Sequence, residues 1–197
     1  MKIQLMNKIA KIGLDKFDSD FEVGEQIAQP DAYMVRSASL HVMEFPCSLK
    51  AIARAGAGVN NIPIEDCANK GIVVFNTPGA NANGVKEVAI CGMLLGCRDV
   101  IGGINWVQAN KDAGDIAKKV EKEKSKFAGN EIAHKKLGVI GLGAIGGPLA
   151  NAARKLGMEV YGCDPYISID AAWHLDSRIR PVKTREEIYA NCDIISL

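Results

Sequence analysis

The sequence lacks several features that would each point to a class of protein. Its 24 lysine and arginine residues nearly balance 23 aspartate and glutamate residues, so no excess of one charge indicates nucleic acid or an acidic membrane as a partner. The longest mostly apolar stretch, residues 88–95, is far shorter than the ~20 residues of a membrane span. We therefore expect a soluble protein with neither kind of partner.

The sequence also contains no closely spaced cysteine pair and no segment that resembles a leader, and it has few aromatic residues. The six cysteines form no C-x-x-C pair, and no apolar run near Met1 resembles a signal peptide, which predicts reduced thiols in a cytoplasm. Aromatic residues make up only 6% of the chain, whereas glycine accounts for 20 of its 197 residues. Abundant glycine favours loops that wrap a phosphate-bearing ligand.

Short apolar runs alternate with longer periodic runs, and Gly, Pro or Asn separates them, which is typical of an α/β fold with parallel sheets. A length of 197 residues allows one or two domains. In the first half we expect strands at 3–6, 32–35, 49–53 and 72–75 and helices at 15–25, 39–45 and 64–70. Apolar residues return at helical spacing over 83–110, which predicts one long element crossing between domains.

The second half repeats the alternation. A charged stretch at 118–126 has alternating signs, as on a solvated helix or arm. We then expect strands at 137–140, 159–163, 178–182 and 193–197, with helices at 146–156 and 185–190. The predicted domains are residues 1–97 and residues 98–197.

A glycine-rich turn carries the strongest chemical signal. Gly141, Gly143 and Gly146 form a G-x-G-x-x-G pattern that follows an apolar strand and opens a helix, the context that a dinucleotide-binding turn requires. The first glycine permits the turn, the second lets a pyrophosphate approach, and the third lets helix and strand pack. A turn that merely packs a helix on a sheet is the alternative.

Asp164 follows the next strand, 18 residues beyond Gly146, where a carboxylate accepts hydrogen bonds from the adenosine ribose. The next residues, Pro165, Tyr166 and Ile167, offer no cation for a 2′-phosphate. These residues favour NAD over NADP, unless Asp164 is an ordinary cap of the strand.

Longer segments extend this pattern over almost the whole chain. They are MVRS at 34–37, RAGAGVNN at 54–61, GIVVFNTP at 71–78, Glu87, and KLGVIGLG at 136–143. The sequence thereby resembles the D-2-hydroxyacid dehydrogenase family, most closely its D-3-phosphoglycerate dehydrogenase branch. The resemblance implies a flavodoxin-like substrate domain followed by part of a Rossmann domain that binds NAD.

The resemblance also assigns roles to residues. The backbone of Ala57 and Gly58 and the side chain of Asn81 would face the substrate carboxylate, and Arg36 would hold a substrate phosphate. Thr77 would touch the nicotinamide end of NAD. The remaining cofactor-binding residues would be Gly141, Gly143, Ala144, Ile145, Gly146 and Asp164. A strand-end surface charge at Arg36 and a plain turn residue at Asn81 remain the alternatives.

Four positions depart from the family pattern. Asn60 stands where Asp is common, and Lys86 stands where Ala is usual. Ala144 and Gly147 replace an Arg that many relatives carry near the pyrophosphate, which moves phosphate binding further onto backbone N–H groups.

Catalysis by this family uses an Arg, a Glu and a His, and the resemblance places all three beyond Leu197. We interpret His41, His134 and His174 as surface or structural residues. We therefore expect no catalytic residue in this chain, no metal site, and no activity of this piece alone. The implied reaction is NAD-dependent oxidation of D-3-phosphoglycerate, the first step of serine synthesis.

Two other functions stay open: oxidation of another D-2-hydroxy acid, and NAD sensing by a non-catalytic protein that resembles transcriptional co-repressors. Residues 99–126 resemble the family's dimerisation region, so we expect a homodimer or higher homo-oligomer with Trp106 at the interface, unless Trp106 only packs in a core.

Overall fold

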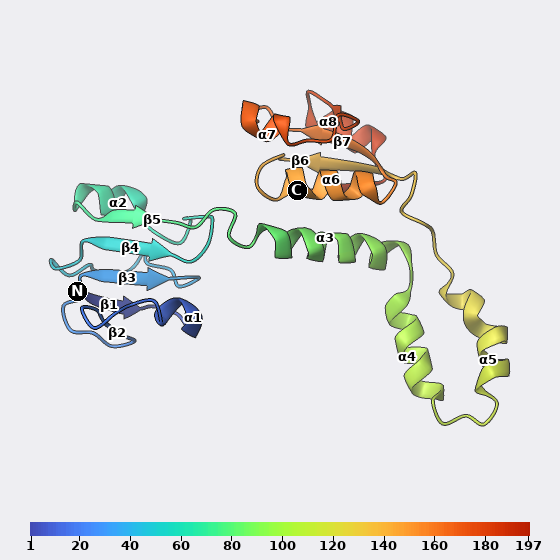
Figure 1. Ribbon diagram of the computed structural model, residues 1–197, viewed down its shortest axis with the longest axis horizontal. Coiled ribbons are helices and arrows are strands. Elements are labelled where there is room, and N and C mark those ends of the chain that lie inside the picture. The colour runs from blue at the N-terminus through green and yellow to red at the C-terminus, as the bar shows by residue number, and fades with distance from the viewer. The chain divides into compact units, whose positions relative to one another are not determined.

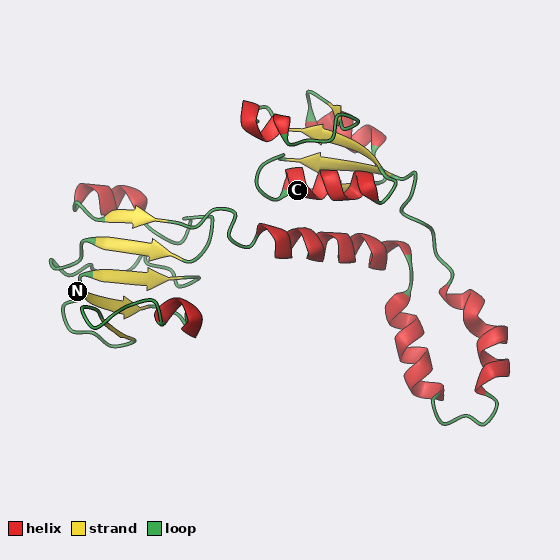
Figure 2. Cartoon of the chain, in the orientation of Figure 1, coloured by secondary structure: helices red, strands yellow, loops and turns green.

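Two separately packed units make up the chain in the computed structural model, which describes residues 1–197 (Figures 1 and 2). The first unit is Met1–Asn81 and the second is Ala82–Leu197. Helix α3 (Ala82–Cys97) belongs to the second unit because it packs on helix α6 (Gly146–Lys155). The division expected after Cys97 would place α3 with the first unit instead.

A five-stranded parallel sheet forms the first unit, in the order β2-β1-β3-β4-β5. This is the flavodoxin-like order 2-1-3-4-5, which confirms the expected fold class. Because all strands are parallel, their carboxyl ends meet at one edge, where Val35 of β3 lies opposite Arg54 of β4. The elements are β1 (Lys2–Leu5), α1 (Lys11–Leu14), β2 (Glu22–Gly24), β3 (Ala32–Val35), β4 (Ala51–Arg54), α2 (Ile64–Asn69) and β5 (Val73–Phe75).

The helix expected at 15–25 is wrong. Phe17 and Phe21 have helical spacing, and their rings do contact each other with centroids 5.1 Å apart. A turn intervenes, however, because the Asp18 side chain accepts the N–H of Asp20 at 3.0 Å. The chain then continues as edge strand β2 beside β1. A polar turn therefore ends the helix that the apolar periodicity predicted.

The helix expected at 39–45 is also wrong. Leu40 is fully buried, and its N–H donates to the carbonyl of Asn61 at 2.8 Å rather than within a helix. Phe45 precedes Pro46, and a residue before proline disfavours helical backbone. Residues 39–45 therefore form an irregular segment that contributes Leu40 to the core.

The element expected over 83–110 is two helices, α3 and α4 (Val100–Asn110). The break falls at Asp99, whose side chain accepts the N–H of Gly102 at 2.9 Å and so caps a new helix. The charged stretch then forms α5 (Ile116–Glu123) and the short 3-10 helix η1 (Lys124–Phe127). No helix is both long and apolar enough to cross a membrane.

A four-stranded parallel sheet in the order β8-β7-β6-β9 forms the core of the second unit, the order 3-2-1-4 of a Rossmann fold. Side chains alternate between sheet faces, so Val139 faces α6 whereas a side chain at Gly138 would meet Ile188 of α8. The polar stretch after Asp164 contains a helix that the sequence did not predict, α7. The elements are β6 (Lys136–Ile140), β7 (Glu159–Cys163), α7 (Ile169–Trp173), β8 (Arg180–Pro181), α8 (Arg185–Asn191) and β9 (Ile194–Ser196).

Candidate functional site

The glycine-rich turn lies between β6 and α6, and each glycine meets a different steric demand. Gly141 has a φ of +91°, a backbone conformation that favours glycine. A Cβ on Gly146 would collide with the carbonyl oxygen of Gly141. Around Gly143, in contrast, no protein atom lies within 4 Å of a Cβ position, so this face is open to a ligand.

The start of α6 presents free hydrogen-bond donors. The N–H of Gly147 donates to the carbonyl of Gly143 at 3.1 Å, whereas the N–H groups of Gly143, Ala144 and Ile145 donate to no protein acceptor. These donors and the positive end of the helix dipole attract an anion without any charged side chain. The geometry suits a phosphate group.

Asp164 supports the same turn from the end of β7. One carboxylate oxygen accepts the N–H of Leu142 at 2.8 Å and the other accepts the N–H of Tyr166 at 2.9 Å. A carboxylate has about four acceptor sites, so Asp164 can still accept hydrogen bonds from ribose hydroxyls. It therefore shapes the turn and remains available to a ligand.

Two hollows border this turn. The first, of about 290 Å³, includes Asp164 and Asp176 among its lining residues. Hydrogen bonds from Arg178 hold the pKa of Asp176 well below its ordinary value, so this second carboxylate is ionised. The other hollow, of about 450 Å³, borders Gly143 and Ala144, and no carboxylate lines it. The two carboxylates thus disfavour an anion in the first hollow, whereas the second hollow, beside the free N–H groups, can accept one.

In the first unit, the turn after β4 also presents N–H groups. The carbonyl of Gly56 accepts the N–H of Thr77 at 3.0 Å, and the carbonyl of Ala57 accepts the side-chain amide of Asn76 at 2.6 Å. The carbonyl of Gly58 accepts the guanidinium of Arg54. All peptides are trans, so each following N–H points away from its bonded carbonyl. The N–H groups of Ala57, Gly58 and Val59 are thereby free for an anion.

The turn after β3 lies beside it and carries a cation. The side-chain oxygen of Asn7 accepts the N–H groups of Arg36, Ser37 and Ala38 at 2.8, 3.0 and 3.0 Å. The Arg36 side chain is exposed and forms no ion pair, so it is free to meet a second anion.

Comparison with known proteins places these features in a family. The family profile described as D-isomer specific 2-hydroxyacid dehydrogenase, catalytic domain, matches residues 2–192. The chain belongs to this family. It is 32% identical to the D-3-phosphoglycerate dehydrogenase of Synechocystis over 86% of the chain and 29% of that protein. It is also 32% identical to the D-3-phosphoglycerate dehydrogenase of Methanocaldococcus jannaschii over 99% of the chain and 36% of that protein.

Among solved structures, the chain is similar to NAD+-bound 3-phosphoglycerate dehydrogenase of Entamoeba histolytica, with a TM-score of 0.68 and 27% identity, covering 100% of this chain and 62% of that one. The chain thus spans about a third of the length of these curated relatives.

Within this family member, the structure brings the predicted residues together in two groups. Arg36, Ala57, Gly58 and Thr77 lie at the carboxyl edge of the first sheet. Asn81 is the last residue of the first unit, exposed and with its side chain free of hydrogen bonds. The cofactor residues Gly141, Gly143, Ala144, Ile145, Gly146 and Asp164 lie at the carboxyl edge of the second sheet.

Sequence reasoning missed the side chains that hold the first group. Asn7 and Asn76 follow β1 and β5 closely, and Arg54 ends β4. A polar residue at the carboxyl end of a buried parallel strand is the signal that would have drawn attention to them.

The histidines make other contacts. The Nε2 of His41 pairs with the carbonyl of Asn60 at 2.9 Å, and the carbonyl of His174 accepts the side-chain amide of Asn151 at 2.7 Å. No three His, Cys, Asp or Glu side chains come together where they could hold a metal ion.

Proposed function

We propose that this chain binds NAD and a D-2-hydroxy acid for the NAD-dependent oxidation of D-3-phosphoglycerate to 3-phosphohydroxypyruvate, the first step of serine synthesis. The observation that carries the proposal is the pair of free N–H turns, one on each sheet's carboxyl edge, in a member of the 2-hydroxyacid dehydrogenase family.

The residues of the second unit fit a dinucleotide. Its pyrophosphate would accept hydrogen bonds from the N–H groups of Gly143, Ala144 and Ile145, over the open face of Gly143. Asp164 would accept hydrogen bonds from the adenosine ribose hydroxyls. Asp164 and the ionised Asp176 repel a 2′-phosphate, which favours NAD over NADP. When bound, NAD supplies the hydride acceptor.

The residues of the first unit fit a phosphorylated hydroxy acid. The substrate carboxylate would accept the N–H groups of Ala57 and Gly58, and the exposed Arg36 would pair with the phosphate. Asn81 would add a side-chain hydrogen bond to the carboxylate, and Thr77 would touch the nicotinamide end of the cofactor. The names of the relatives in Synechocystis and Methanocaldococcus jannaschii support this substrate.

This chain's part in the reaction is therefore to bind and orient. Oxidation requires a base to take the proton of the C2 hydroxyl as the hydride leaves C2. None of the three histidines lies at either free N–H turn in a pair with a carboxylate. We propose that the family's Arg, Glu and His, in residues that follow Leu197 in the whole protein, supply this chemistry.

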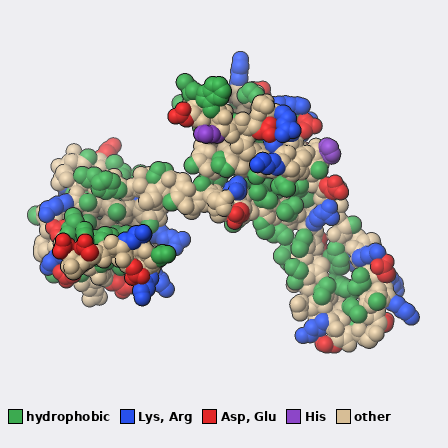
Figure 3. Space-filling model, viewed as in Figure 1, with side chains coloured by type: hydrophobic (Ala, Val, Ile, Leu, Met, Phe, Trp, Pro, Cys, Tyr) green, Lys and Arg blue, Asp and Glu red, His purple; other side chains and the backbone are tan.

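The arm of α4 and α5 supports a homodimer. Trp106 packs inside the arm, where its ring lies 6.3 Å from Phe127 and its N–H donates to Glu123 at 2.9 Å. Ile101, Ile104 and Val107 of α4 remain more than half exposed, and Figure 3 shows apolar side chains gathered over this part of the unit. A second copy would cover them.

The six free cysteines suit a reducing cytoplasm.

The decisive experiment is an assay of NADH formation by the full-length protein that carries this chain, with D-3-phosphoglycerate, D-glycerate and D-lactate as substrates. We expect turnover with NAD+, highest for D-3-phosphoglycerate and lost with NADP+. Higher turnover of an unphosphorylated acid would contradict the substrate. NAD binding without turnover of any hydroxy acid would contradict the enzyme and favour a sensor.

A further inference from the structure

We infer that Arg54 sets the spacing between the two anion-binding turns of the first unit and thereby selects hydroxy acids that also carry a phosphate. The inference rests on the proposed function, because it assigns the carboxylate to the turn after β4 and the phosphate to Arg36. Arg54 itself touches neither group, so it is a positioning residue.

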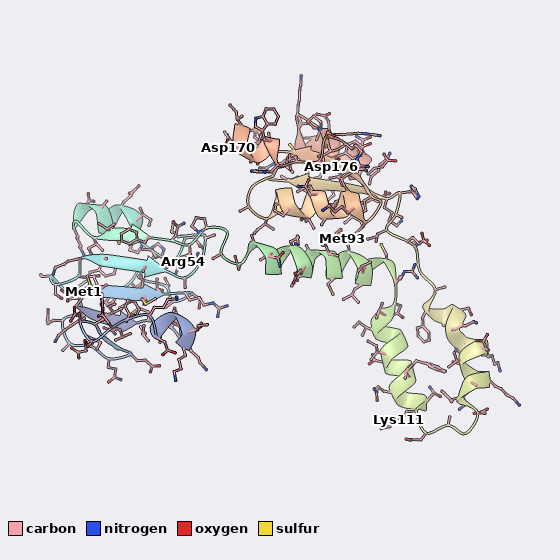
Figure 4. All side chains as sticks on the ribbon, in the orientation of Figure 1. Met1, Arg54, Met93, Lys111, Asp170 and Asp176 are labelled. Atoms are coloured by element: carbon pink, nitrogen blue, oxygen red, sulfur yellow. The ribbon has the colours of Figure 1, made fainter.

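The guanidinium of Arg54 bonds both turns at once. Its Nε donates to the carbonyl of Arg36 at 3.2 Å, and its Nη1 donates to the carbonyl of Gly58. The first contact holds the residue that would bind phosphate, and the second holds the turn that would bind carboxylate. Figure 4 shows Arg54 at the carboxyl end of β4, from which the second turn departs.

The sheet register explains why such a bridge is needed. Val35 and Arg54 are partners across β3 and β4, so both turns leave the sheet from neighbouring positions. Beyond this pair, one last ladder hydrogen bond runs from the N–H of Ala55 to the carbonyl of Val35 at 2.8 Å, and no backbone hydrogen bond joins residues 36–38 to residues 56–59. A planar guanidinium with five N–H donors in a fixed fork fixes two acceptors at a set separation, whereas a lysine ammonium is a flexible point charge.

Gly56 makes room for the guanidinium. A Cβ at this position would lie 3.1 Å from Nη1 and 3.2 Å from Cζ of Arg54. The carbonyl of Gly56 accepts the N–H of Thr77, which helps to hold this backbone in place, so the guanidinium would have to shift by a few tenths of an ångström. The Gly56→Ala variant would therefore displace the Arg54 fork without removing its charge.

The charge of Arg54 is free of ion pairs, and its partners are main-chain carbonyls. The main-chain carbonyl of Arg54 accepts the hydroxyl of Thr77 at 3.4 Å, which also links the turn after β5 to the end of β4. Arg36 differs, because its exposed guanidinium bonds no protein group. Arg36 is thus free for the ligand, while Arg54 is occupied by the protein.

Selectivity for a phosphate therefore depends on both arginines in different ways. Removing Arg36 deletes the phosphate contact. Replacing Arg54 by lysine keeps the positive charge but no longer fixes the distance between the two anion-binding turns. Misplacing a bound group by about 1 Å costs up to about a hundredfold in rate. A substrate held at one point only, such as D-glycerate, does not sense the spacing.

The test compares kcat/KM for D-3-phosphoglycerate and for D-glycerate in full-length wild type, Arg54→Lys and Gly56→Ala. We expect the ratio of the two values to fall about tenfold or more in both variants, chiefly through KM for D-3-phosphoglycerate, with KM for NAD unchanged. The matched control is Arg154→Lys, since Arg154 also bonds a main-chain carbonyl, that of Met158, but in the second unit.

The outcomes separate the inference from the proposed function. If wild type prefers D-3-phosphoglycerate and both variants keep the wild-type ratio, Arg54 does not set selectivity and the inference fails alone. Equal losses for both substrates would reduce Arg54 to a purely structural residue and overturn it too. A wild type that oxidises neither compound would contradict the proposed function, and the inference would fall with it.

Discussion

The carboxyl edges of the two sheets present free N–H groups by different means. In the second unit, the N–H groups of Gly143, Ala144 and Ile145 come from the start of a helix, and glycines provide the necessary space. In the first unit, the carbonyls around Ala57 and Gly58 are turned inward by Asn76 and Arg54. One edge therefore depends on the absence of side chains, and the other depends on their presence.

This difference decides which substitutions break each edge. A methyl group in the wrong place should damage the second unit most, whereas loss of a polar side chain should damage the first. Independent packing of the units lets each effect be followed separately.

The largest expected effect is that of Gly146→Ala. Its Cβ would collide with the carbonyl of Gly141 and lie 3.0 Å from Cγ1 of Val139. We expect the free energy of unfolding of the second unit to fall by about 3 kcal/mol or more, at the upper end of overpacking. Chemical denaturation followed by circular dichroism measures it.

Gly143→Ala is the matched control, because its Cβ meets no protein atom within 4 Å. We expect a change in stability of less than about 0.5 kcal/mol, with weaker NAD binding. Equal destabilisation by both variants would contradict the steric account of the turn.

The converse test in the first unit is Asn7→Ala. Three N–H groups lose their shared acceptor, and that of Ala38 is only partly exposed. We expect the first unit to lose about 1–2 kcal/mol of unfolding free energy, as when a helix cap is removed. NAD binding to the second unit should not change, as calorimetric titration would show. A loss of NAD binding would mean that the two edges are not independent.

Asp164→Asn sharpens the comparison because it removes a charge and keeps an acceptor. The amide oxygen can still accept the N–H of Leu142, so the glycine turn should keep its shape, whereas the amide nitrogen cannot replace the oxygen that accepts the N–H of Tyr166. We expect NAD binding to weaken about tenfold through weaker hydrogen bonds to the ribose, and discrimination against NADP to decrease. Unaltered binding of both cofactors would remove Asp164 from the cofactor site.

The smallest effect is expected on acidification, where both units should behave alike. The N–H of Lys2, followed by the ammonium of Lys50, lowers the pKa of Asp31, and Arg178 lowers that of Asp176. A lowered pKa in the folded state stabilises the fold above the ordinary value of about 3.9, and this contribution is lost as pH falls through the folded value. Both carboxylates are only partly buried and their cationic partners are exposed to solvent, so the loss is small.

Melting temperatures between neutral pH and about pH 2 test this in Asp31→Asn and Asp176→Asn. Each variant should show a flatter decline than wild type in its own unit. A steeper decline in either variant would reverse the assigned sign.

The sequence predicted the second edge better than the first for the same physical reason. The turn from Gly141 to Gly146 is local: its glycines and the flanking strand and helix are contiguous in the chain, so they can be recognised from the sequence. Asn7 and Arg36 are 29 residues apart in sequence and meet only because β1 and β3 are neighbours. Contacts that depend on strand register cannot be read from spacing along the chain.

The errors in secondary structure have a similar origin. The strand at Ala32–Val35 was predicted to the residue, because its burial is set by its own apolar run. Residues 39–45 and edge strand β2 were mistaken for helices, because their hydrogen bonds go to Asn61 and to β1. The helix break at Asp99 depends on one side-chain cap within an apolar pattern that otherwise continues.

The most direct test is a two-dimensional amide NMR titration of this chain with NAD+ and, separately, with D-3-phosphoglycerate. NAD+ should shift the amide signals of Gly143, Ala144 and Ile145, and D-3-phosphoglycerate should shift those of Ala57, Gly58 and Val59. Both ligands perturbing the same turn, or NAD+ leaving residues 143–145 unmoved, would contradict the claim that each edge is built for its own anion.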